Sequence, residues 1–157
     1  MSSALLQRIV SGGQTGVDRA ALDAAIRHGI AHGGWCPRGR LAEGGTVPDR
    51  YALRETNSWD YAERTEKNVL DSNGTLILNS GPLEGGTLLT REFAEEHGRP
   101  WLLVDLEAGL DAPAVRDWLR ARNIGVLNVA GPRESKRPGI YVLASRALDE
   151  LVSTQAR

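Results

Sequence analysis

The stretch Ser11–Asp23, with the sequence SGGQTGVDRAALD, constrains the fold more than any other part of this chain. It follows Arg8–Val10, a short apolar segment typical of a buried strand. Apolar residues then recur at helical spacing from Val17 onward, so the stretch predicts a strand, a glycine-rich turn and a helix. Free backbone N–H groups and the positive end of the helix dipole converge at such a turn, which makes it a preformed anion site.

The turn matches neither of the common phosphate-binding fingerprints. It lacks the Gly-Lys-Ser/Thr of a Walker A loop and the G-x-G-x-x-G of a dinucleotide fold. Glycines also permit a sharp turn without any ligand, and that interpretation stays open at this point. The polar residues Gln14, Thr15 and Asp18 favour a binding site, because a bare turn does not need them.

Further apolar segments alternate with helical patterns along the rest of the chain. After Arg8–Val10, the predicted strands are Ala31–Cys36, Gly74–Asn79, Trp101–Leu106 and Gly125–Ala130. Asn57 and Ser58 are predicted to cap the helix before Gly74, and Thr87 to lead the helix after Asn79. Apolar strands between amphipathic helices are typical of a parallel sheet covered on both faces. We therefore expect an α/β fold of three layers, with about five mainly parallel strands in an open sheet, forming one domain over residues 1–157.

This topology brings three glycine-containing turns to one edge of the sheet. Right-handed crossovers place the turns Gly12–Thr15, Ser80–Thr87 and Gly131–Arg137 together at the carboxyl ends of the strands, where open α/β sheets bind ligands. Backbone N–H groups and guanidinium groups at such an edge can hold phosphate or another oxyanion. Of the basic residues near these turns, Arg38 and Arg133 are predicted to bind. Surface and binding roles stay equally open for the others, which are Arg40, Lys136 and Arg137. The long segment 37–55 is predicted to be an ordered loop that covers the site.

The composition narrows the class of partner. Nineteen basic and twenty acidic residues give a net charge of −1, so we expect neither nucleic acid nor a membrane as a partner. One cysteine excludes an internal disulfide framework, and the three histidines form no predicted metal set. Cys36 is interpreted as a small buried residue, with a reactive thiol as the alternative. No signal peptide or spanning apolar run is visible, which predicts a cytoplasmic protein. No nucleophile–histidine or paired-carboxylate arrangement follows from spacing, so no catalytic residue is predicted.

Several motifs together resemble the molybdenum cofactor carrier family. The motifs are SGGQTGVDRAALD at 11–23, GWCPRGR at 34–40, YAERT at 61–65, NVLDS at 68–72, GGT at 85–87 and NVAGPRES at 128–135. The resemblance runs from about Ile9 to Leu151. It implies a Rossmann-like fold, a homo-oligomer (dimer or tetramer) and binding of the molybdenum cofactor, a pyranopterin that carries a phosphate. A non-catalytic carrier is then expected, with molybdenum enzymes as its recipients.

The chain is also similar to the lysine-decarboxylase-like nucleotide-binding group, which includes the cytokinin-activating phosphoribohydrolases. Those enzymes carry Pro-Gly-Gly-x-Gly-Thr-x-x-Glu after a strand and an arginine on the preceding helix. Arg64 matches that arginine and Gly86–Thr87 the Gly-Thr, but Thr90 stands in the position of the glutamate. Threonine cannot serve as the carboxylate acid/base for N-glycosidic cleavage, so Glu84 would have to substitute. A nucleotide sensor or a phosphoribohydrolase-like enzyme acting on nucleoside monophosphates is therefore the alternative function.

Together, these arguments predict one set of ligand-binding residues. The set is Gly12, Gly13, Gln14, Thr15, Asp18, Arg38, Arg64, Glu84, Gly85, Gly86, Thr87, Gly131, Pro132, Arg133, Glu134 and Ser135.

Overall fold

A computed structural model of the protein describes residues 5–153. Five strands form the main sheet, in the order β2-β1-β9-β7-β8, and every neighbouring pair is parallel. Their bounds are β1 Arg8–Val10, β2 Ala31–Gly33, β7 Gly74–Asn79, β8 Trp101–Asp105 and β9 Val126–Ala130. The helices are α1 Val17–Arg27, α2 Tyr61–Leu70, α3 Gly85–Glu96, α4 Ala112–Ala121 and α5 Ile140–Ser153. The predicted three-layer, Rossmann-like fold is confirmed.

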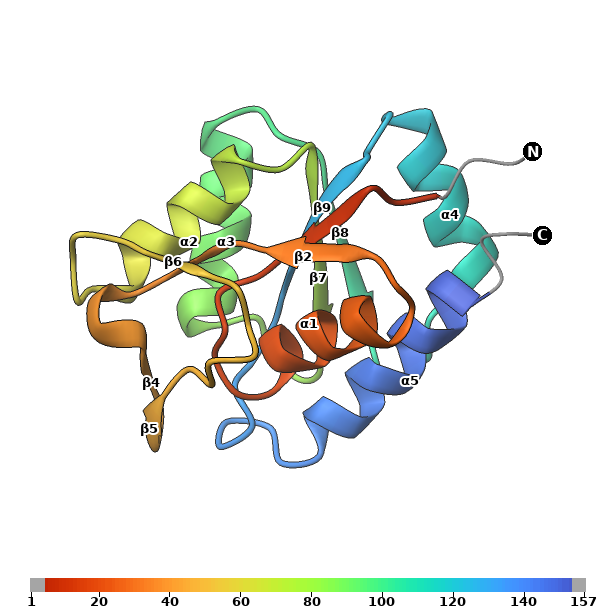
Figure 1. Cartoon of the computed structure of the whole chain (residues 1–157). Coiled ribbons are helices and arrows are strands. Elements are labelled where there is room, and N and C mark those ends of the chain that lie inside the picture. The colour runs from red at the N-terminus through yellow and green to blue at the C-terminus, as the bar shows by residue number, and fades with distance from the viewer. Residues whose placement is uncertain (1–4, 154–157) are drawn as a thin grey trace.

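The helices cover the sheet in two groups. The connections β1–α1–β2 and β7–α3–β8 run in opposite directions across the sheet, so right-handed crossovers place α1 and α3 on opposite faces. α5 packs along α1, and α2 packs along α3 (Figure 1). Every residue of β7 is buried, as expected for a central strand with both faces covered, whereas β8 is an edge strand with Leu103 exposed. The sheet thus supplies a rigid floor for the turns at its carboxyl edge.

The helix starts differ slightly from those predicted. Asp60, and neither Asn57 nor Ser58, caps α2, since its carboxylate accepts the N–H of Ala62 at 3.0 Å. α3 begins at Gly85, two residues before Thr87, so two glycines lie in its first turn.

The predicted strand Ala31–Cys36 divides at Gly34. Gly34 has a φ of +127°, and a Cβ there would lie 2.3 Å from the carbonyl oxygen of Ser11. β2 therefore ends at Gly33, and β3 (Trp35–Cys36) turns away to pair with β6 (Arg54–Glu55) in a separate parallel pair. Two glycines in a strand pattern commonly mark such a break.

The segment 37–55 is ordered, as predicted. It contains a short 3₁₀ turn η1 (Arg38–Arg40) and a hairpin of β4 (Leu41–Ala42) and β5 (Gly45–Thr46). Its apolar side chains form a second small core against α1, made of Leu22, Cys36, Ala42, Val47 and Tyr51. No helix within residues 5–153 combines the length and apolar character needed to cross a bilayer.

Candidate functional site

A cavity of about 250 Å³ lies at the carboxyl ends of β1, β9 and β7. It is bounded by the first turns of α2 and α3 and by the turn after β9. The strand order reverses direction here, because the chain leaves β1 towards β2 and leaves β7 towards β8. Open α/β sheets bind ligands at such a switch point, so the cavity lies where the fold predicts a site.

Most of the predicted residues line this cavity. They are Gly12, Gln14, Asp18, Arg64, Glu84, Gly85, Gly86, Thr87, Gly131, Pro132 and Arg133. Five predicted residues do not: Gly13, Thr15, Arg38, Glu134 and Ser135. The cavity also has lining residues outside the predicted set, among them Tyr61, Thr65, Asn79, Asn128, Lys136 and Arg137.

The first turn, Ser11–Gly16, is closed by its own contacts. The backbone N–H of Gln14 donates to Asp18 Oδ2 at 3.1 Å, and the N–H of Thr15 donates to Gln14 Oε1 at 3.1 Å. A Cβ on Gly16 would lie 2.4 Å from the carbonyl oxygen of Pro132, so the turn after β9 packs directly on it. The Asp18 carboxylate and the Gln14 amide oxygen therefore each occupy an N–H group that the sequence assigned to an external anion.

Arg64 and Asp18 form a buried ion pair behind this turn. Arg64 Nη1 lies 3.5 Å from Asp18 Oδ2 and donates to the carbonyl oxygen of Gly12 at 2.9 Å. The side chains are only 12% and 9% exposed. Burial raises the pKa of Asp18 above its ordinary value, while Arg64 and the N–H of Gln14 oppose that rise. The arginine from α2 thus holds the first turn in place.

Two cations lie near the ring of Tyr61 at the α2 side of the cavity. The guanidinium carbons of Arg64 and Arg133 lie 5.2 Å and 5.8 Å from the centroid of its ring, which is the range of cation–π contacts. This aromatic ring and the two arginines give that wall both a flat face and positive charge.

The second turn, by contrast, is open. Within the described residues 5–153, no side chain caps the N-terminus of α3, and its first residues Gly85, Gly86 and Thr87 line the cavity. A Cβ on Gly86 would meet no atom within 4 Å, and one on Gly85 would meet only Lys136 Nζ at 4.0 Å. Free N–H groups, a positive helix dipole and a nearby ammonium group are the features that favour an anion at this end of the cavity.

Arg137 joins the second and third turns. Its guanidinium donates from Nε to the carbonyl oxygen of Ser80 at 2.6 Å and from Nη2 to Glu84 Oε1 at 3.3 Å. Glu84, the residue that would have to act as a general acid, is therefore paired with a cation at the rim. Thr90 is buried and donates its hydroxyl to the carbonyl oxygen of Gly86 at 2.9 Å, so it only stabilises the first turn of α3.

Asn79 and Asn128 were absent from the predicted set, although the sequence carries a signal for them. Asn79 is the last residue of the apolar strand GTLILN, and Asn128 is a polar residue in the middle of VLNVA. Both are buried, at 4% and 3% exposure. A buried amide at the carboxyl end of a parallel strand faces the edge where ligands bind, and this position distinguishes it from core residues.

The five predicted residues outside the cavity hold the surrounding structure together. Gly13 faces Leu53 of the loop, and Arg38 lies over the ring of Trp59 at 5.3 Å. Glu134 accepts the N–H groups of Gly139 (2.6 Å) and Tyr141 (3.0 Å) at the start of α5.

Thr15 and Ser135 meet at Glu43, which lies at the tip of the β4–β5 hairpin. Its carboxylate accepts the hydroxyl of Thr15 and, at 2.5 Å, the hydroxyl of Ser135. Burial opposes ionisation of Glu43, but the hydrogen bonds from Ser135 and Thr15 outweigh it and lower the pKa of this carboxyl. The hairpin therefore clamps the first and third turns from outside.

The expectation that loop 37–55 covers the site is wrong for this structure. None of its residues lines the cavity. Val47 and Leu53 pack towards Gly13, so the loop lies on the outer side of the first turn. Arg40 donates to the carbonyl oxygens of Val47, Pro48, Tyr51 and Leu53, which makes it a brace within the loop. Cys36 is buried in the same small core, and burial raises the pKa of its thiol, in agreement with its interpretation as a small buried residue.

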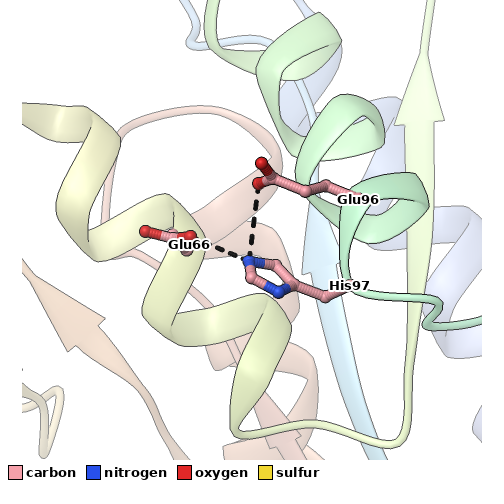
Figure 2. A group of neighbouring side chains, drawn as sticks. All are labelled: Glu66, Glu96 and His97. Carbon is pink, nitrogen blue, oxygen red and sulfur yellow. Dashed lines mark hydrogen bonds and ion pairs between the residues drawn. The ribbon is translucent and has the colours of Figure 1, made fainter.

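One group of side chains outside the cavity has metal-ligating types. Figure 2 shows Glu66 of α2 beside Glu96 and His97 at the end of α3, with all three ligand atoms within 4.8 Å of one another. His97 Nε2 lies 2.8 Å from Glu66 Oε2 and 3.6 Å from Glu96 Oε2. The Glu96 side chain is 64% exposed. The hydrogen bond between His97 at the end of α3 and Glu66 of α2 accounts for this geometry without a metal.

Comparisons with known proteins agree with this architecture. The chain is 50% identical to a crystallised protein of Syntrophus aciditrophicus named as a putative molybdenum carrier protein, with a TM-score of 0.90 over 96% of this chain and 97% of that one. Among curated proteins, none matches the chain. The family model of the circularly permutated YpsA SLOG family matches residues 9–152. The chain therefore belongs to the circularly permutated YpsA SLOG family.

Proposed function

We propose that the protein binds the molybdenum cofactor in this cavity and carries it without changing it. The observation that carries the proposal is the open N-terminus of α3, which faces the cavity beside Lys136. A phosphate ester on that helix end gains hydrogen bonds from backbone N–H groups that have no other acceptor. The name of the Syntrophus aciditrophicus relative supports molybdenum carriage as the role.

The rest of the cavity suits the organic part of such a ligand. Tyr61, Arg64 and Arg133 line the cavity together, so a flat ring there meets one aromatic and two guanidinium side chains. Asn79, Asn128 and Gln14 add amide groups along the floor. A flat, polar heterocycle with a phosphate at one end matches this division of the cavity.

The residues of the cavity favour a role in binding the ligand over a role in catalysis. Thr90 provides no carboxylate and is occupied by the carbonyl oxygen of Gly86. The carboxylate of Glu84 is engaged by Arg137 at the rim, with Nη2 of Arg137 3.3 Å from Oε1 of Glu84.

Titration of the purified protein with molybdenum cofactor, and separately with a nucleoside monophosphate, tests the proposal. We expect tighter binding of the cofactor, and we expect Lys136→Gln to weaken it roughly 5-fold to 10-fold by removing one charge near the phosphate. Arg38→Gln is the matched control, because Arg38 lies over Trp59 away from the cavity and should change affinity less than about 2-fold. Equal affinity for cofactor and nucleotide contradicts the carrier role.

Nucleotide binding is the second candidate, because the α3 N-terminus can accept the phosphate of a nucleoside monophosphate equally well. Incubation with nucleoside monophosphates and detection of free base and ribose phosphate distinguishes an enzyme from a sensor. Product formation supports a phosphoribohydrolase-like activity, whereas binding without product supports a sensor.

Three further expectations belong to this proposal. They are a homo-oligomer, delivery to molybdenum enzymes and a cytoplasmic location without nucleic-acid or membrane partners. Light scattering coupled to size exclusion measures the first directly.

A further inference from the structure

Two buried side-chain amides at the cavity each have an atom without a partner among residues 5–153. They are Gln14 Nε2, a donor, and Asn79 Oδ1, an acceptor. Gln14 is 6% exposed and Asn79 is 4% exposed, and both line the cavity. A buried polar atom without a partner costs about 1–3 kcal/mol, so native proteins rarely keep one unless something else satisfies it.

The surrounding hydrogen bonds fix which end of each amide is free. Gln14 Oε1 accepts the N–H of Thr15 at 3.1 Å and the N–H of Glu43 at 2.9 Å. Two donors can share only an oxygen, so the free atom of Gln14 is its NH₂ group. Asn79 Nδ2 donates to the carbonyl oxygen of Gly81 at 3.0 Å, so the free atom of Asn79 is its oxygen.

The two amides flank one strand of the cavity floor. Gln14 follows β1 and Asn79 ends β7, and both strands pair with β9. A ligand lying across the end of β9 therefore lies between the side chains of Gln14 and Asn79.

We propose that this pair recognises the heterocycle of the ligand. Gln14 Nε2 donates to a carbonyl oxygen or ring nitrogen, and Asn79 Oδ1 accepts from a ring N–H or amino group. The ligand class is a phosphate ester of a nitrogen heterocycle with a cyclic amide, because such rings carry both kinds of group. This inference rests on the proposed function, which places the phosphate at α3.

Glu43 acts in this recognition as a positioning residue. Its backbone N–H orients the Gln14 amide, and its carboxylate is held by Thr15 and Ser135. The hairpin thus fixes the orientation of the Gln14 amide without itself lining the cavity.

Calorimetric titration of the full chain with two phosphates tests the proposal. The probes are 6-hydroxymethylpterin phosphate, which has the ring, and glycerol phosphate, which lacks it. Gln14→Met should weaken binding of the pterin phosphate about 10-fold to 100-fold and leave glycerol phosphate within about 2-fold. Gln7→Met is the matched control, since Gln7 is exposed just before β1, at the other end of the sheet, and should change neither affinity.

Asn79→Leu gives a second, independent measurement if Gln14→Met does not fold, and the same selective loss is expected. Equal loss of both phosphates in the variants, or no preference of the wild type for the pterin phosphate, overturns the inference and leaves the phosphate site standing. Failure of the wild type to bind either phosphate overturns the proposed function as well.

Discussion

The first and second turns of the cavity are both rich in glycine, but they differ in whether their backbone N–H groups already have acceptors. In Ser11–Gly16 the N–H groups of Gln14 and Thr15 already have side-chain acceptors, and added Cβ atoms would collide with neighbours. In Ser80–Thr87 the helix end is uncapped, and Gly86 faces empty space. Glycine therefore serves close packing in the first turn, whereas in the second turn Gly86 leaves open space beside the helix end. A glycine-rich turn indicates an anion site only where its N–H groups are not already satisfied.

The strongest test of the closed first turn removes its buried cation. Arg64→Met leaves Asp18 buried without its ion pair and should lower the free energy of unfolding at pH 7 by about 3–5 kcal/mol. Burial already raises the folded-state pKa of Asp18 and Arg64 opposes this, so the variant raises that pKa further. A carboxyl whose pKa is raised in the folded state stabilises that state at low pH. This stabilisation is lost as pH rises above the pKa of the unfolded state, about 3.9. Urea unfolding should therefore show a deficit that shrinks on acidification.

The double variant Arg64→Met with Asp18→Asn serves as the control for charge. It has no buried carboxyl, so its stability should depend less on pH than that of the single variant. A deficit in Arg64→Met that does not change between pH 4 and pH 7 would show that Arg64 acts through packing alone.

A matched pair of glycine substitutions compares the two turns directly. Gly16→Ala places a Cβ 2.4 Å from the Pro132 carbonyl oxygen at a φ of +81°, and should cost about 2–4 kcal/mol of stability. Gly86→Ala meets no atom and lies in a helix, so its stability should change by less than about 1 kcal/mol. Its added methyl group enters the cavity, so affinity for phosphate esters should fall instead. Thermal unfolding and phosphate titration on both variants separate the effects, and a stable Gly16→Ala protein would contradict the closed turn.

The difference between the turns explains what the sequence could and could not reveal. The strand Arg8–Val10 and the turn and helix in Ser11–Asp23 follow from local spacing, and the meeting of the three turns at one edge follows from right-handed crossovers. Whether a turn is open depends on contacts from distant segments, such as Arg64 reaching Gly12 and Pro132 packing on Gly16. The sequence predicts binding by Arg38 and leaves it open for Arg40, because composition cannot show their existing partners. Arg40 is already bonded to backbone carbonyl oxygens, and Arg38 already lies over Trp59.

The smallest expected effect concerns the hairpin that clamps the first turn from outside. Glu43→Gln keeps the shape of the side chain but removes the charge that accepts hydrogen bonds from Thr15 and Ser135, which should cost about 1 kcal/mol at pH 7. Because the folded-state pKa of Glu43 is lowered, its stabilisation is present above the unfolded value and lost as pH falls through the folded one. The difference in the free energy of unfolding between wild type and variant should therefore vanish in acid. A variant whose fold is damaged in general would instead stay less stable than the wild type in acid. Glu95→Gln, which breaks an exposed pair with Arg91 on α3, is the control and should have almost no effect. If Glu43→Gln matched that control at pH 7, the first turn would owe its closure to Arg64 and Pro132 and not to the hairpin.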